Sequence, residues 1–525
     1  MSNASLARIA ARFATLALAE RQAVYLKLRE QGLSPGQFPI VPAPAGERGR
    51  LSRAQERQWF LWRMDPTSTA YHIAGGLRLR GALQVDALQC ALDVLVQRHP
   101  ALRTFCIQDA AGTPRQEMDA AMRVAIDRVD LRAAADPERA LAEAAAALNA
   151  RPFDLLQGPL LRFALFQLAD DEHVLVAVLH HLISDGWSMQ VLLDELAACY
   201  RAATQGASAD LPPLAVDYAD YAAWQRSWLE AGEETRQLDY WRAQLDGDDP
   251  WLQLPADAPR GSGQSWRSAR CAIALPARLA GALRQACQRE GQTLFGVLLG
   301  LFQVLLQRES GLDDIRVGVP TANRGRQDTA GLIGLFVNTQ VLRNVLSGAH
   351  TLGQAVARAR EALVQAQAHG ELPLDRIVDA LRLGRSAERN PLFQVMANHL
   401  RDDYRALASL PGLCLEPYAV PQNDTPFELT LETREDTAGG LAATFIYAAD
   451  LFQAERMRAL GERYVSLLQT WLAAPDTRIA ALEWLTPAQH GQLLALGQGG
   501  AARPGMSVPQ RLAAQALATP DAPAL

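Results

Sequence analysis

Residues 174–189 have the sequence VLVAVLHHLISDGWSM, and this stretch predicts the fold around it. The six apolar residues at 174–179 are typical of a strand that is buried on both faces. Two histidines and a tight Asp-Gly turn follow, and we expect a helix over Met189–Ala203 with Ser188 as its N-cap. A buried strand that leads through a turn into a helix indicates an α/β protein.

The two adjacent histidines, His180 and His181, are the first candidates for chemistry. Successive side chains of a strand point to opposite faces, so only one ring can point into a given cavity. An imidazole has an unperturbed pKa of about 6.5, which suits a general base. Asp185 can orient a ring or brace the turn through an arginine. Histidines that merely pack at a strand end are the ordinary alternative, but the pair together with the Asp-Gly turn favours function. No metal site is expected, because neighbours on opposite faces do not easily chelate one ion.

The composition excludes several classes of protein. The chain has 525 residues, of which 49% are hydrophobic and 21% charged, as in soluble globular proteins. There are 51 Lys and Arg against 57 Asp and Glu, so a net charge of −6 gives no global attraction for nucleic acid or anionic membranes. No apolar run approaches the roughly 20 residues of a membrane span, and no secretory signal is present. We therefore expect a cytoplasmic protein without nucleic-acid or membrane partners.

Lysine and cysteine usage narrows the chemistry further. Lys27 is the only lysine, and it lies in no phosphate-binding loop or Schiff-base setting, so phosphate-loop ATPases and pyridoxal enzymes are excluded. The six cysteines are scattered and form no CxxC pair. Buried thiols are therefore expected, rather than a zinc site or a disulfide framework.

The order of expected elements is similar in the two halves of the chain. The first half contains a helix at 85–98 and strands within 160–180. The second half contains strands at 268–275, 314–319, 334–342, 428–433 and 442–447, and helices at 279–290, 293–308, 352–368, 374–382 and 453–472. Two α/β lobes of comparable size follow from this pattern. The predicted division is a helical leader and linker at 1–47, lobes at 48–228 and 229–488, and a linker at 489–525.

Six motifs in order point to a known family. His180–Gly186 resembles the HHxxxDG motif of condensation domains in nonribosomal peptide synthetases, which have a chloramphenicol-acetyltransferase-like fold. The other five motif-like stretches are Leu51–Leu61, Arg98–Phe105, Tyr218–Gln225, Ile333–Thr339 and Asn390–Gln394. The resemblance runs from about residue 51 to residue 485. The tail Pro520–Leu525 resembles the opening of an adenylation domain.

The resemblance implies an architecture and a reaction. Two chloramphenicol-acetyltransferase-like lobes would form a V-shaped pseudo-dimer within a monomer, with the site at their junction. The reaction would be transfer of an acyl, aminoacyl or peptidyl group from a thioester to the amine of a carrier-bound aminoacyl acceptor. The chain itself would bind no cofactor. Phosphopantetheine arms would come from peptidyl carrier protein domains, and the adenylation domain would follow downstream.

The resemblance also assigns roles to residues. His181 would stand at the reaction centre, as a base or as a group that positions the amine, while His180 packs at the strand end. Asp185 would be structural and paired with an arginine, and the candidates are Arg103, Arg316 and Arg326. Gly186 would permit a backbone shape and a close substrate approach, and its amide is a candidate oxyanion donor.

Further residues receive weaker assignments from their positions in the motifs. Trp187, Ser188, Asn338 and Arg103 are candidates for substrate contact, although Asn338 could equally stabilise a turn and Arg103 could be structural. Packing roles are expected for Trp59, Phe60, Tyr218, Tyr221 and Trp224.

Alternative functions stay open at this point. An epimerization domain shares HHxxxDG, but the stretches 336–339 and 390–394 favour condensation. A free-standing CoA-dependent acyltransferase and a non-catalytic platform that recruits partner enzymes are further alternatives. Met1 is interpreted as a natural start, which would make the donor arrive in trans. The donor is then either an upstream synthetase's carrier or an acyl-CoA, and acyl-CoA would make this the starter domain of a lipopeptide synthetase.

Overall fold

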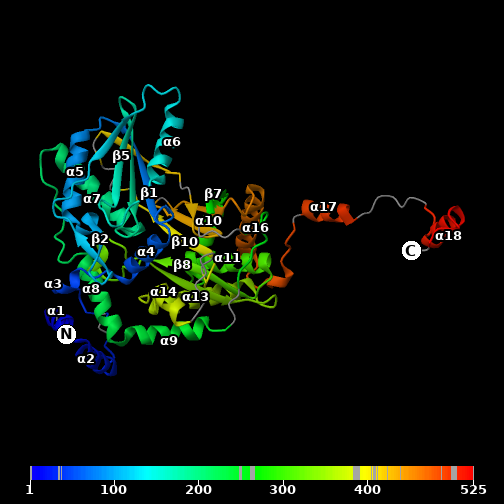
Figure 1. Ribbon diagram of the computed structural model, residues 1–525, viewed down its shortest axis with the longest axis horizontal. Coiled ribbons are helices and arrows are strands. Elements are labelled where there is room, and N and C mark those ends of the chain that lie inside the picture. Colours follow the sequence, from blue (N-terminus) through cyan, green and yellow to red (C-terminus); the bar gives the residue numbers. More distant parts are fainter. Residues whose placement is uncertain are drawn as a thin grey trace. The chain divides into compact units, whose positions relative to one another are not determined.

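The structure is a computed structural model. It describes residues 3–33, 36, 38–247, 251–260, 266–381, 391–403, 405, 410, 412–421, 424–437, 439–485, 487–497 and 505–523. The chain divides into two compact units, Met1–Ile479 and Ala480–Leu525. The first unit contains two lobes, each built on its own sheet (Figure 1).

The first lobe has a five-stranded sheet in the order β11-β1-β6-β5-β4. Its strands are β1 (His72–Gly81), β4 (Ile126–Asp130), β5 (Leu161–Ala169), β6 (Glu172–His180) and β11 (Leu413–Tyr418). Strand β6 pairs antiparallel with β1 and with β5. Every residue of β6 after Glu172 is buried, so the predicted central strand with two covered faces is confirmed.

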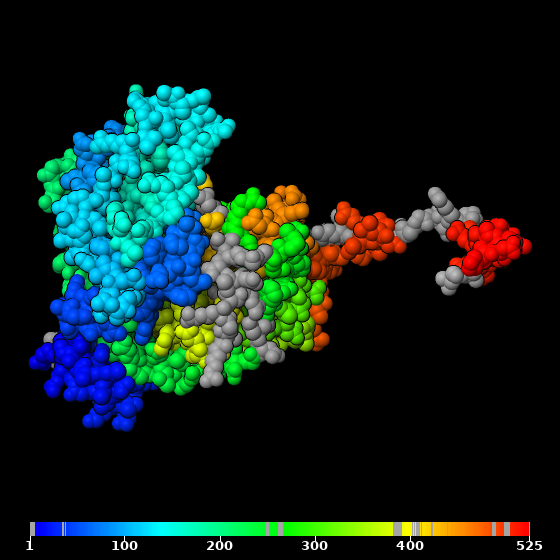
Figure 2. All heavy atoms as spheres, viewed as in Figure 1, coloured from blue at the N-terminus to red at the C-terminus, as the bar shows by residue number. Residues whose placement is uncertain are grey.

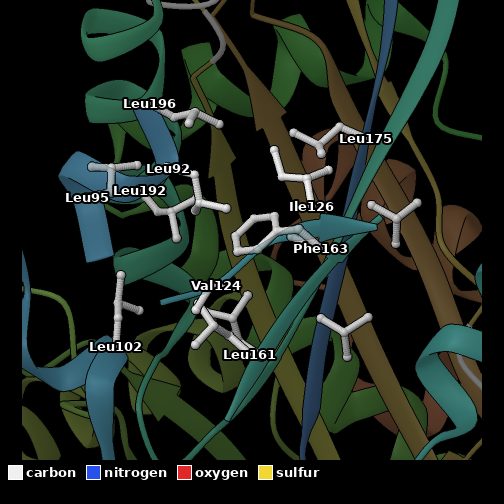
Figure 3. Packing of buried hydrophobic residues seen from close by; sticks show 14 of the residues in the cluster. Leu92, Leu95, Leu102, Val124, Ile126, Leu161, Phe163, Leu175, Leu192 and Leu196 are labelled. Carbon is white, nitrogen blue, oxygen red and sulfur yellow. The ribbon is translucent and has the colours of Figure 1, made fainter. Parts of the chain in front are cut away.

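Two helices, α5 (Val85–Arg98) and α7 (Gly186–Thr204), lie together on one face of this sheet, and α6 (Pro137–Ala150) contacts β5 and β6. Figure 3 shows Leu92 of α5 and Leu192 of α7 facing Phe163 of β5 within the core. The helix at 85–98 is where its apolar periodicity predicted it. The lobe also contains α4 (Arg53–Met64), the short turn η2 (Pro100–Arg103) and a hairpin of β2 (Thr104–Gln108) and β3 (Pro114–Met118).

The second lobe has a seven-stranded sheet in the order β12-β7-β14-β13-β10-β8-β9. These strands are β7 (Trp266–Ile273), β8 (Asp314–Thr321), β9 (Asn338–Val345), β10 (Val395–Asp402), β12 (Asp424–Thr425), β13 (Leu429–Asp436) and β14 (Leu441–Ala448). Its helices are α10 (Ala277–Arg289), α11 (Leu294–Ser310), α12 (Gln327–Ala330), α13 (Leu352–Ala368), α14 (Leu374–Ala380) and α16 (Ala454–Ala473).

Helix α11 forms the centre of the second lobe. It is buried from Gly296 to Gln307 and packs against α13, α16 and β8. Gly300 allows α13 to come close, since a Cβ there would lie 2.9 Å from the Cα of Val356. The predicted long buried helix at 293–308 is therefore confirmed, and the helix predicted at 352–368 coincides with α13.

Strand β11 crosses from the second half of the chain into the sheet of the first lobe. It pairs antiparallel with β1, from Gly76 opposite Tyr418 to Gly81 opposite Leu413. Leu410 and Leu413 are part of the first lobe's core. A division into lobes at 48–228 and 229–488 misses this exchange, because β1 would otherwise present an unpaired edge.

The leader packs against the body of the first unit. It consists of α1 (Asn3–Thr15), α2 (Leu18–Glu30) and α3 (Ala45–Arg48). The Tyr25 hydroxyl donates to Glu233 at 2.7 Å, and Phe13 and Tyr25 join a buried cluster with α8 (Tyr218–Trp228). Helix α8 continues through η3 (Leu229–Glu233) into α9 (Glu234–Leu245). Helices α1 and α2 fall within the predicted helical leader and linker at 1–47, and α3 begins there at Ala45.

The second unit begins at Ala480, earlier than the linker predicted at 489–525. It contains the end of η4 (Ile479–Ala481), α17 (Pro487–Gly497) and α18 (Val508–Ala518), and α18 buries no residue. Ala524 and Leu525, at the end of the adenylation-like stretch, lie outside the described residues. In the described parts of the chain, no helix combines the length and the apolar character that crossing a membrane requires.

The predictions for residues 334–337 and for Phe60 are wrong. The strand predicted at 334–342 starts only at Asn338, because the backbone of residues 334–337 bonds to the first lobe instead of to a neighbouring strand. Phe60 was expected in the core, but it is 45% exposed on α4, whereas Trp59 is buried as expected.

Candidate active site

The HHxxxDG motif connects β6 to α7 near the place where the two lobes meet. His180 ends β6 opposite His72 of β1, and Asp185 is the N-cap of α7. The Asp185 carboxylate accepts the backbone N–H of Ser188 at 2.8 Å. Ser188 is therefore not the N-cap that we expected; it lies inside the first turn of α7, because the stronger acceptor three residues earlier caps the helix.

Figure 2 shows the surface hollowed between the cyan part of the first lobe and the orange part of the second.

The hydrogen bonds of His181 determine which of its ring nitrogens carries the proton. Its backbone N–H donates to the Tyr71 carbonyl at 2.9 Å. Its Nδ1 lies 3.2 Å from the Ser184 carbonyl oxygen. Because a carbonyl only accepts, Nδ1 carries the hydrogen and Nε2 keeps its lone pair. Nε2 is therefore able to accept a hydrogen bond or a proton.

The electrostatic surroundings of His181 favour the neutral ring. Burial is the largest cause that lowers the pKa of His181, and the positive charge of Arg57 lowers it further. The negative charge of Asp185 and the bond to Ser184 act in the opposite direction. A neutral imidazole at neutral pH is the form that a general base needs.

His180 has a structural environment. His180 is 5% exposed, and its Nδ1 accepts the backbone N–H of Leu182 at 3.0 Å. The rings of His72 and Phe153 stand edge-on to it at 6.1 Å and 6.2 Å. Burial, followed by the neighbouring His72 and His181, lowers the pKa of His180 well below its ordinary value. These contacts fit the expected packing role.

Asp185 is the centre of a buried network between the lobes. One carboxylate oxygen accepts from Arg324 at 3.1 Å and from the amide and hydroxyl of Ser188, each at 2.8 Å. The other oxygen accepts from the amides of Phe336 and Val337 at 2.9 Å and 3.2 Å. The Arg324 and Asp185 side chains are only 1% and 2% exposed. Paired in this way, the carboxylate is not available as a base.

Arg324 is the arginine that the sequence could not identify. It donates to the carbonyls of Thr329 and Leu332 at 2.7 Å and 2.6 Å, and its guanidinium lies 3.9 Å above the Phe336 ring. Arg324 thus fastens a loop of the second lobe to the motif of the first. Burial lowers the pKa of Arg324, and the charge of Asp185 opposes this effect.

The three arginines that we expected as partners are used elsewhere. Arg103 donates to the Val96 carbonyl at 2.9 Å, and Arg316 pairs with Asp314 at 3.2 Å. Arg326 donates to the carbonyls of Gly36 and Phe38 in the leader. Arginine pairing of Asp185 is thus found, but all three named partners are wrong. No local pattern distinguishes Arg324 from Arg326, which is only two residues away.

Gly186 and Trp187 lie on the open side of the motif. The Gly186 backbone is not in the left-handed region, and a Cβ there would meet nothing within 4 Å. A special backbone shape is therefore not the reason for this glycine, although the space beside it is open. Trp187 is 46% exposed, and its Nε1 donates to the Ala330 carbonyl at 3.0 Å.

The other candidates for substrate contact have structural positions. Ser188 is fully buried and also donates to the Gly334 carbonyl at 2.9 Å. Asn338 donates to the carbonyls of Gly370 and Leu372 at 2.8 Å and 2.7 Å. These bonds fit the second role expected for Asn338, stabilisation of a turn. Arg103 is 7% exposed and bound to backbone carbonyls. Tyr218, Tyr221 and Trp224 are packed, as expected.

Sequence reasoning also missed Arg57, Asp375 and Tyr71. Arg57 of α4 lies 3.6 Å from Asp375 of α14, measured from Nε to Oδ1. Tyr71 supplies the carbonyl that holds the His181 amide. Only Arg57 had a signal, because it falls within the first motif at Leu51–Leu61. Within the described ranges, no three His, Cys, Asp or Glu side chains are grouped as a metal site requires.

Comparisons with known proteins agree with this geometry. A family model described as "Condensation domain" matches residues 47–494. Subunits C and B of linear gramicidin synthase from Brevibacillus parabrevis are each 42% identical to this chain, over 87% and 88% of it. The chain spans only 6% and 9% of the lengths of these two relatives.

Solved structures show the same fold. The X-domain from teicoplanin biosynthesis is 30% identical, with a TM-score of 0.76 over 85% of this chain and 100% of that one. The condensation domain from the monacolin K polyketide synthase MokA has a TM-score of 0.73 at 23% identity, over 82% of this chain and 99% of that one. The predicted pair of chloramphenicol-acetyltransferase-like lobes is thus confirmed. The chain belongs to the condensation domain family, the amide-forming acyltransferases of nonribosomal peptide synthetases.

Proposed function

We propose that this chain joins the acyl group of a phosphopantetheine thioester to the amine of an aminoacyl group held on a carrier protein. The observation that carries this proposal is the state of His181, whose Nδ1–H is held by the Ser184 carbonyl, so that Nε2 keeps its lone pair. A neutral imidazole there suits an amine that must lose a proton as it attacks a carbonyl carbon.

The reaction balances without a cofactor. The acceptor nitrogen attacks the thioester carbonyl, a C–N bond forms and the C–S bond breaks. The nitrogen gives up one proton, which His181 receives and which ends on the departing pantetheine sulfur. A thioester is already reactive, so correct placement of the amine by His181 supplies much of the acceleration. The Gly186 amide, at the positive end of α7, is the proposed donor to the developing oxyanion.

The donor has two candidate sources that share one chemistry. A peptidyl or aminoacyl carrier protein and an acyl-CoA both present a phosphopantetheine thioester, so the same His181 serves either one. The elongating and the starter functions therefore differ only in what delivers the donor. In either case we propose a cytoplasmic monomer that works with carrier domains and with an adenylation domain downstream.

The test supplies one aminoacyl carrier acceptor with each donor in turn. Intact-mass measurement of the carrier would reveal an N-acyl product. Turnover with acyl-CoA and no upstream carrier supports the starter function, and turnover only with a carrier-bound donor supports elongation. Absence of amide with every donor, or an inverted α-carbon in place of a new amide, refutes the proposal.

A second candidate function follows from the likeness to the teicoplanin X-domain, which has also been solved in complex with OxyB. A protein of this fold can therefore recruit a partner, and for this chain recruitment without catalysis is the alternative. The intact HHxxxDG motif favours catalysis. A recruitment platform would perform equally well after His181→Ala, which separates the two functions.

A further inference from the structure

The bridging loop, residues 324–337, lies between β8 and β9 and binds two distant parts of the chain. One of these parts is the HHxxxDG motif. Arg324 donates to the Asp185 carboxylate at 3.1 Å, and the amide of Phe336 donates to the same carboxylate at 2.9 Å. The geometry of the motif therefore depends on where the bridging loop lies.

The second part of the chain that the bridging loop binds is the leader. Arg326 donates to the carbonyls of Gly36 and Phe38, and Asp328 accepts the backbone N–H of Ile40 at 3.1 Å. Phe38 and Ile40 are buried, so these bonds are made at a closed contact. All three leader partners are backbone groups, and the loop therefore fixes the path of the leader chain and not particular side chains.

Bonds within the bridging loop join its two binding functions. Arg324 donates to the carbonyls of Thr329 and Leu332 at 2.7 Å and 2.6 Å. The hydroxyl of Thr329, which is fully buried, donates to the Arg326 carbonyl at 2.9 Å. A change at Arg326 therefore reaches Arg324 both along two residues of backbone and through Thr329.

The leader is also anchored on α8, independently of the bridging loop. The backbone N–H of Ala43 donates to Asp220 at 2.9 Å, and Asp220 also pairs with Arg48 of α3. The Arg326 guanidinium itself lies 4.6 Å from the centre of the Trp224 ring. The leader therefore offers the bridging loop a fixed surface to bind.

We propose that the leader positions the active site: by binding Arg326 and Asp328, it keeps Arg324 in the place that the motif requires. Arg326 is thus a positioning residue, which acts through the bridging loop. The inference rests on the proposed function only for the activity that is measured, because the bonds of the bridging loop are present whatever the reaction is.

The first test compares Arg326→Met, which still packs on Trp224 but has no donor, with Arg326→Lys, which keeps a charged donor. Arg326→Met should lower kcat for amide formation about 10-fold, because a displaced motif misplaces the reacting groups. KM for the carrier-bound acceptor should stay within about twofold of wild type. Arg326→Lys should recover most of the loss in kcat. A higher KM at unchanged kcat in Arg326→Met would overturn the inference.

Asp328 supplies an independent pair of variants at a more exposed side chain, which is 38% exposed. Asp328→Ala removes the acceptor of the Ile40 amide and should lower kcat about threefold. Asp328→Asn keeps an acceptor oxygen and should match wild type. If Arg326→Met does not fold, as a melting curve would show, this pair is measured with the same readouts.

Hydrogen exchange measures the position of the bridging loop without reference to the reaction. The amides of Phe336 and Val337 both donate to Asp185. In Arg326→Met these two amides should exchange about 10-fold faster than in wild type. The matched control is Tyr25→Phe, which removes the leader's 2.7 Å bond to Glu233 and none of the bonds of the bridging loop. It should leave both the exchange and kcat unchanged.

The two readouts separate positioning from general stability. Unchanged exchange in Arg326→Met, or an equal loss of kcat in Arg326→Met and Tyr25→Phe, would overturn the inference. Failure of the proposed function would look different: wild-type protein would form no amide with any donor, while the difference in exchange between Arg326→Met and wild type would persist.

Discussion

The loop from His180 to Ser188 has a buried side and an open side, and the two sides differ in how far their polar groups are hydrogen-bonded. On the buried side, the Asp185 carboxylate accepts from Arg324, Ser188, Phe336 and Val337. On the open side, His181 uses one ring nitrogen for a backbone carbonyl, and Trp187 is 46% exposed. Satisfied polar groups fix the geometry, while an unfilled lone pair remains for substrate. Substitutions on the two sides should therefore fail in different ways.

The largest effect is expected on the buried side. Asp185→Ala leaves the Arg324 charge buried without its partner and the amides of Phe336 and Val337 without an acceptor. Loss of one member of a buried pair costs about 3–5 kcal/mol of unfolding free energy. Urea denaturation measures this loss, and Asp375→Asn is the matched control at the exposed cross-lobe pair, where we expect less than about 1 kcal/mol. Equal stability of Asp185→Ala and wild type would show that the network does not hold the lobes.

A substitution on the open side should reduce activity and leave stability unchanged. His181→Ala removes the group that receives the amine proton, so amide formation should fall about 10²- to 10⁴-fold. The structure gives the ring one hydrogen bond, to the Ser184 carbonyl. Removal of the ring should therefore leave the melting temperature close to that of wild type. Product mass and a melting curve on the same preparation measure both. Near-full turnover would remove His181 from the reaction centre.

The two sides also differ in how far the sequence predicted them. Helices 85–98 and 352–368 were predicted because an apolar stripe is a local signal. His181 was predicted because its motif is contiguous. Arg324 was not, since 139 residues separate it from Asp185 and only folding brings them together. The exchange of β11 was missed for the same reason, because strand pairing between distant segments leaves no mark on either segment.

A pH effect should distinguish His180 on the buried side from ordinary surface histidines. Its pKa in the folded protein lies well below the value of about 6.5 in an unfolded chain. The unfolded state therefore binds protons more readily than the folded state. The stability that neutral His180 contributes is complete above pH 6.5 and is lost as the pH falls below that value. His180→Asn keeps an acceptor for the Leu182 amide but does not titrate. The decrease in unfolding free energy between pH 7 and pH 5 should be smaller in this variant than in wild type, and an identical decrease would contradict the assignment.

The smallest effect is expected at Glu371. This residue contrasts most sharply with Asp185, because few donor groups offset the burial of its carboxyl group. Asn323 donates to it at 3.4 Å, and burial raises the pKa of Glu371 to about 7, against the weaker opposing charge of Arg326. The folded-state value lies above the unfolded value of 4.5, so the stability that the protonated group contributes is complete below pH 4.5 and is lost as the pH rises through 7. A glutamine stays neutral and escapes this loss.

Glu371→Gln should therefore match wild type in urea denaturation at pH 4.5 and exceed it by about 1 kcal/mol at pH 8, after allowance for partial exposure. The exposed Glu361, on α13 of the same lobe, provides the control substitution Glu361→Gln, for which the two pH values should give the same difference from wild type. If Glu371→Gln behaves like this control, then solvent reaches the carboxylate and burial does not hold its proton. If it gains stability only at the higher pH, the contrast is established: five donor groups surround the Asp185 carboxylate, whereas at Glu371 burial outweighs the charge of Arg326 and the bond from Asn323 and raises the pKa.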